Sequence, residues 1–186
     1  RACHQILSFG GQGILIATMK KWHTKPDILA ACCSAMQRMI FQLFDDLNLA
    51  STFCEMDALD LVVEVMKEFP EHEELQTSGL GVLSNLVVGK DNDPRIQHAA
   101  LKFVMALDGL WLVAATMNAF LYNLSVQKYG CRLLDNLTLY GDFRAEMLQA
   151  RILVSVAIAK TEYPMVEAAI HEKALRVFKY IFGDDE

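Results

Sequence analysis

One apolar pattern occurs four times in this chain, at a spacing that suits a repeated helical unit. In its clearest copy, which starts at Leu75, apolar residues follow at steps +5, +7, +8 and +11. Such spacing places apolar side chains on one face of a buried helix. The other copies start at Ile28, Val126 and Ile170. The residue at step +4 is small or slim in every copy: Cys32, Gly79, Gly130 and Ala174. A small residue lets a neighbouring helix approach closely, so we expect an array of one helical unit.

A second apolar segment precedes each copy of the pattern. These segments cover residues 14–19, 61–66, 112–117 and 153–158. Their β-branched residues would also suit strands. Two observations favour helices: the segments continue into charged or polar turns, and three of them end nine residues before the next pattern begins. Because the segments recur in register with a helix, we predict that they are helical.

A third, shorter element leads into the second one. Residues 6–12 and 53–59 each contain an apolar pair followed by a bend. The four starting residues of the main pattern lie 47, 51 and 44 residues apart. A period of about 40–47 residues is typical of armadillo and HEAT arrays.

The third helices of two of the four units carry polar residues at fixed steps. Gln76 and Gln127 stand at +1, and Asn85 and Asn136 stand at +10. With the order of short, longer and longest helix, these residues make the chain resemble the armadillo-repeat family over nearly its whole length. The resemblance implies an all-α, right-handed α-solenoid of about four three-helix repeats. The turn at residues 66–70 is also similar to one in the armadillo region of leucine-rich repeat kinases.

The spacing divides the chain into repeats within a single domain. The third repeat is longer than the others because of residues 88–108, where we expect a loop around 90–94 and a helix boundary at Pro94. Stacked repeats bury the face that no single repeat can cover. The first repeat is expected to lack most of its first helix, and the chain starts without Met, so we expect a fragment of a longer protein. The predicted repeats cover residues 1–42, 43–90, 91–140 and 141–186.

In the families that this chain resembles, the third helices line a concave groove that holds extended peptides. Steps +3, +6 and +10 form one surface row beside the apolar face, and this row contains no acidic residue. Because the chain has a net charge of −6, cations on this row predict an acidic or phosphorylated protein or peptide partner. The candidate partner-binding residues are Arg38, Asn85, Tyr129, Arg132, Asn136, Lys173, Arg176 and Tyr180.

Each residue type on this row also has a purely structural explanation. Long cations can solvate an exposed helix face, asparagines can bond to local backbone, and tyrosines can pack against the next repeat. Family members that bind basic localisation peptides place a Trp four residues before the Asn, where this chain has Gly81 and Arg132. We therefore do not expect this chain to bind basic peptides.

The composition of the chain limits the kinds of partner and the cellular compartment that we expect. Of the 186 residues, 53% are hydrophobic and 22% are charged, which excludes a disordered chain. The negative net charge argues against nucleic acid as the main partner. No apolar run approaches the roughly 18 residues of a membrane helix, so no membrane insertion is expected. Five cysteines without metal-type spacing fit a reducing compartment. We predict a cytoplasmic location, with the nucleus as the alternative.

No enzymatic site can be assembled from the sequence. The five histidines are scattered. The cluster Gly10-Gly11-Gln12-Gly13 lacks the Lys-Ser/Thr of a phosphate-binding loop and falls at a bend between helices. We expect a non-enzymatic interaction scaffold without a metal or cofactor. The alternative is a structural or regulatory segment of a larger multidomain protein that docks through its ends and binds no peptide. The oligomeric state stays open.

Overall fold

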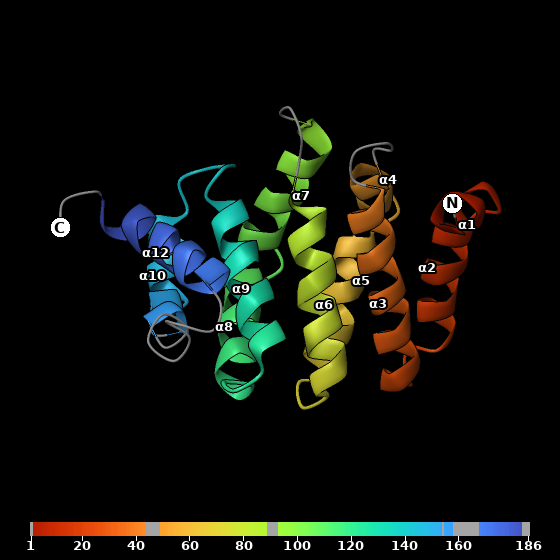
Figure 1. Cartoon of the computed structure of the whole chain (residues 1–186), viewed down its shortest axis with the longest axis horizontal. Coiled ribbons are helices and arrows are strands. Elements are labelled where there is room, and N and C mark those ends of the chain that lie inside the picture. The colour runs from red at the N-terminus through yellow and green to blue at the C-terminus, as the bar shows by residue number, and fades with distance from the viewer. Residues whose placement is uncertain (1, 44–48, 89–92, 154, 158–167, 184–186) are drawn as a thin grey trace. The chain divides into compact units, whose positions relative to one another are not determined.

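The structure is a computed structural model that describes residues 2–43, 49–88, 93–153, 155–157 and 168–183. All regular secondary structure within these ranges is helical (Figure 1). The chain forms two compact units, Arg1–Ala99 and Ala100–Glu186. Each unit is described by itself below.

The first unit contains six complete helices among its described residues. The predicted helices at 14–19 and 61–66 are confirmed, since they lie within α2 and α5. The first helix, α1, spans seven residues, as does α4. The helices are α1 (Ala2–Ser8), α2 (Gly11–Lys21), α3 (Pro26–Gln42), α4 (Leu49–Glu55), α5 (Ala58–Glu68) and α6 (Glu73–Leu86).

The second unit begins within α7 (Pro94–Met105), which crosses the boundary between the units. Pro94 starts this helix, as predicted, whereas most of the loop expected just before it lies outside the described residues. The predicted helix at 112–117 is confirmed within α8. Residues 152–153 and 155–157 are helical, and the rest of the predicted segment 153–158 lies outside the described residues. The other helices are α8 (Gly109–Ala119), α9 (Leu124–Leu137), α10 (Arg144–Gln149) and α12 (Ala168–Phe182).

A residue with a left-handed backbone stands at the bend between the first and the second helix of a repeat. Gly10, Asp57 and Asp108 have φ values of 72°, 57° and 50° and directly precede α2, α5 and α8. Arg151, with φ of 56°, precedes the helical residues 152–153. Glycine adopts this conformation freely and aspartate tolerates it better than most residues do. The glycine cluster at 10–13 therefore serves a bend, as its position predicted.

A buried glutamine ties the third helix of a repeat to the end of the second. Gln76 donates from Nε2 to the carbonyls of Met66 and Phe69 at 2.7 and 3.0 Å. Gln127 does the same to Met117 and Phe120 at 2.8 and 3.2 Å. The last carbonyls of a helix lack intrahelical partners. Each glutamine supplies a missing donor to a carbonyl in the last turn of the second helix and also bonds to the capping residue after it, which explains its recurrence at step +1.

The small residue at step +4 permits close packing, as predicted. A Cβ atom on Gly79 would lie 2.4 Å from the sulfur of Met66, and one on Gly130 would lie 2.6 Å from the sulfur of Met117. Met66 and Met117 are themselves fully buried. In both repeats, therefore, the second helix packs directly onto the backbone of the third.

The cysteines that the structure describes are core residues or close to it. Cys33 and Cys131 are fully buried, and burial raises the pKa of both thiols to about 12. Burial also raises the pKa of Cys54 to about 12. None of these three thiols forms a disulfide. Thiols with such pKa values are poor nucleophiles at neutral pH, so they act as packing residues.

Replacing the residue that caps α6 should measurably destabilise the first unit. His72 accepts the N–H of Leu75 through Nδ1 at 3.2 Å, and its Nε2 lies 3.1 Å from Asp27 on α3. We expect His72→Ala to lower the free energy of unfolding by about 1 kcal/mol, a usual value for a lost N-cap. Asn123 caps α9 in the same way, so His72→Asn should keep most of the stability. Urea unfolding measures both, and equal losses would show that the cap is not the cause.

Candidate ligand-binding site

In the first unit, the residues of the predicted row are not all exposed, although the spacing predicted an open surface. Arg38 is exposed on α3. Asn85, expected on an open groove, is only 3% exposed, and its Nδ2 donates to the carbonyl of Gln37 at 3.1 Å. The reason is Gly81, whose Cβ would lie 2.3 Å from the Gln37 amide, so that α3 packs directly onto this face of α6. The Asn85 amide is therefore engaged in the packing between α3 and α6.

On α9 of the second unit, the predicted residues are half-buried. Tyr129, Arg132 and Asn136 all have intermediate exposure. Desolvation lowers the pKa of the Arg132 guanidinium. Arg132 and Asn136 each take part in further interactions inside the protein. These side chains are thus partly held by the fold.

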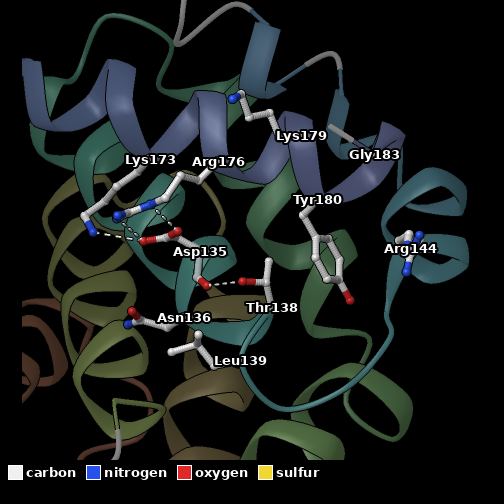
Figure 2. Close-up of a pocket in the computed structure, with 10 residues that line it drawn as sticks. All are labelled: Asp135, Asn136, Thr138, Leu139, Arg144, Lys173, Arg176, Lys179, Tyr180 and Gly183. Atoms are coloured by element: carbon white, nitrogen blue, oxygen red, sulfur yellow. Dashed lines mark hydrogen bonds and ion pairs between the residues drawn. The ribbon is translucent and has the colours of Figure 1, made fainter. Parts of the chain in front are cut away.

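A surface hollow of about 700 Å³ in the second unit brings four of the predicted residues together (Figure 2). They are Asn136 from α9 and Lys173, Arg176 and Tyr180 from α12. The other lining residues lie outside the predicted row; they are Asp135, Thr138, Leu139, Arg144, Lys179 and Gly183.

Asp135 is the central side chain of the hollow. Its carboxylate accepts from Lys173 Nζ at 3.0 Å and from Arg176 Nε and Nη2 at 2.9 and 2.7 Å (Figure 2). The two Arg176 bonds form a fork, the strongest type of guanidinium–carboxylate contact. The hydrogen bond to Asp135 raises the pKa of Arg176 further. Two cations of α12 are therefore held on one carboxylate of α9.

Tyr180 anchors the other end of α12. Its hydroxyl donates to the carbonyl of Gly141 at 2.6 Å and accepts the N–H of Phe143 at 2.8 Å. The guanidinium of Arg144 lies 5.6 Å from the ring centroid. Arg144 also bonds to Asp142 at 2.9 Å, and its backbone and side-chain hydrogen bonds lower the pKa of that carboxyl. Because the hydroxyl and the ring are both engaged, Tyr180 is chiefly a structural residue of the hollow.

The lining of the hollow is strongly basic. Four cations, Arg144, Lys173, Arg176 and Lys179, and one carboxylate, Asp135, line the hollow, and Arg144 also pairs with Asp142, which is not part of the lining. Lys179 is exposed, and its side chain makes no hydrogen bond or ion pair with a residue that the structure describes. The side chain of Leu139, which also lines the hollow, is 76% exposed. Such a surface can attract an anionic group and place an apolar side chain beside it.

Two of the lining residues that the predicted row did not include stand at the same step of the repeat. Asp135 and Lys179 both stand at +9 from the start of the apolar pattern, at Val126 and Ile170, and three residues after Arg132 and Arg176. Residues three apart are neighbours on a helix surface. A wider row that included step +9 would have found both residues.

The described residues offer little for other kinds of site. No three His, Cys, Asp or Glu side chains among them come together as a metal site would require. None of the described helices alone is long and apolar enough to cross a membrane. Only α7 and α8 taken together reach that length and composition, with a sharp bend between them.

Comparison with known proteins agrees with this helical architecture. The fold and its repeated contacts are those of an armadillo-type repeat protein. The sequence model described as LRRK2 ARM repeat matches residues 12–180, and the chain belongs to this family. The resemblance to the armadillo-repeat family is thereby confirmed. Neither a curated protein nor a solved structure matches the chain.

Proposed function

We propose that the chain is a non-enzymatic interaction scaffold that binds an extended acidic or phosphorylated segment of a protein partner. The proposal takes the chain as a right-handed α-solenoid of about four three-helix repeats, acting in the cytoplasm, with the nucleus as the alternative. The partner is a protein or peptide rather than nucleic acid or a membrane. The binding surface is the basic hollow between α9 and α12.

The observation that carries the proposal is the charge of this hollow. Four cations and one carboxylate line it, although the whole chain has a net charge of −6. A basic surface on an acidic body favours acidic partners. Leu139, highly exposed at the hollow, adds a contact for an apolar residue of the same segment.

Reversing the charge of Lys179 should weaken binding without disturbing the fold. The probe is a short labelled peptide of alternating glutamate and leucine, titrated at low salt with fluorescence anisotropy as the readout. Lys179→Glu removes one attraction and adds one repulsion, so we expect roughly 25-fold weaker binding, since each pair at about 4 Å in water is worth about 1 kcal/mol, or about fivefold in affinity. A phosphoserine version of the peptide should show at least the same loss.

The matched control is Lys20→Glu on α2. Lys20 is also exposed and also makes no hydrogen bond or ion pair with a described residue. Lys20→Glu changes the net charge by the same amount as Lys179→Glu, and Lys20 lies in the first unit. Binding should also weaken as salt is added. Equal affinity of the wild type and Lys179→Glu, or binding of a glutamine–leucine peptide as tightly as the acidic one, would refute the proposal.

The same titration tests the alternative function, docking through the ends of the chain. This alternative is supported by Phe9 and Ile14, which are 82% and 61% exposed near the start of α2. A segment that docks only through such apolar residues should bind neither peptide.

A further inference from the structure

The cations of the hollow are not equally available to a ligand. Lys173 and Arg176 already bond to Asp135, whereas Lys179 has no such partner among the described residues. The Lys173 side chain is 26% exposed and that of Arg176 is 50% exposed, so solvent still reaches both. An incoming anion can therefore contact these two cations, but it meets them beside a carboxylate.

Asp135 occupies the place that a ligand carboxylate would take. Its two oxygens already accept the three N–H donors that α12 presents, and only 13% of its side chain is exposed. A second anion near the same cations is repelled by Asp135, and it competes for their donors. Asp135 thus docks α12 onto α9 and at the same time opposes anion binding.

Glu172 differs from Asp135 in its bonding partners and in the exposure of its side chain. Among the described residues its carboxylate bonds to Arg176 alone, one turn away on the same helix, and its side chain is 68% exposed. Exposed pairs of this kind contribute little to stability or to binding. Asp135 is therefore the acidic residue that governs the hollow.

We propose that Asp135 is a built-in competitor of the ligand, which lowers the affinity of the hollow for acidic segments and makes binding depend on release of Lys173 and Arg176. This inference rests on the function proposed above. It requires a ligand with several negative charges, because a single carboxylate would only replace the one already present. A segment with consecutive acidic residues, or with a phosphorylated side chain among them, meets this requirement.

Removing the charge of Asp135 should therefore strengthen binding. Asp135→Asn keeps the shape of the side chain and one acceptor oxygen for the cations. We expect the acidic peptide to bind about fivefold more tightly at low salt, the effect of one repulsive pair at about 4 Å in water, with the difference shrinking as salt rises. Glu64→Gln, at an exposed position on α5 in the other unit, makes the same charge change and should leave affinity unchanged. Thermal unfolding checks that both variants are folded.

A measurement on the unmodified protein covers the case in which Asp135→Asn does not fold. The Nε–H resonance of Arg176 should move as the acidic peptide is added, because its bond to Asp135 is exchanged for one to the ligand. If the wild type binds the peptide but this resonance stays in place, or if folded Asp135→Asn binds no more tightly than Glu64→Gln, the competitor role of Asp135 is wrong while the proposed function stands. If neither the wild type nor any variant binds the peptide, both proposals fall.

Discussion

Gln76→Met should lower the free energy of unfolding by about 2–3 kcal/mol, because it removes a buried donor from two carbonyls while nearly preserving volume. Of the two carbonyls, that of Met66 loses more when this donor is removed. Its usual intrahelical partner would be the N–H of residue 70, which is a proline and has none. Phe69 also accepts the N–H of His72 and so keeps one bond. Gln127→Met should act in the same direction in the second unit.

The control for this prediction is Gln97→Met on α7. Gln97 is exposed and lies outside the helix junctions, so its replacement should change stability by less than about 0.5 kcal/mol. Urea unfolding monitored by circular dichroism measures all three variants. A midpoint for Gln76→Met equal to that of Gln97→Met would contradict a stabilising role for the glutamine.

Gly79→Ala should destabilise the chain by about 2 kcal/mol, although alanine normally favours a helix. The added methyl group would overlap the sulfur and Cγ of Met66, at 2.4 and 2.8 Å, and overpacking of this kind costs about 1–3 kcal/mol. Gly13→Ala is the matched control, since the nearest atom to its Cβ is the terminal methyl of Met56 at 3.9 Å. It should stabilise α2 by up to about 1 kcal/mol.

A double substitution distinguishes overpacking from other causes. Met66→Ala alone opens a cavity and should cost stability. In the Gly79→Ala background it should cost clearly less, because the smaller side chain makes room for the new methyl group. Additive losses in the two backgrounds would show that the contact with Met66 does not explain the effect of Gly79→Ala.

The helices could be predicted from the sequence because their signals are local and repeated. Residues 61–66 and 112–117 are rich in β-branched side chains, yet their fixed distance from the next pattern identified them as helices, and α5 and α8 confirm this. Gln76 was recognisable as a family feature, but its hydrogen-bond acceptor was not. The carbonyl of Met66 lies ten residues away on another helix, and only the packing of α5 on α6 brings them together.

The site was predicted less completely, because its charges are paired through tertiary structure. Lys173 and Arg176 were identified as cations of one row. Their partner Asp135 lies 38 and 41 residues away, on the neighbouring ridge of α9. Asn85 was predicted on an open groove, but Gly81 lets α3 cover that face. Spacing along one helix assigns a face to a residue, whereas it does not say which other helix covers that face.

The glutamine links also bear on where this chain can be cut. Within α5 and α6, or α8 and α9, the end of one helix is completed by a side chain of the next. A truncation between the members of such a pair strips donors from buried carbonyls. A truncation just before Asp57 or Asp108, at the bends that open these pairs, leaves the links intact. The pair of helices closed by its glutamine is therefore the natural module for shortening or grafting this protein.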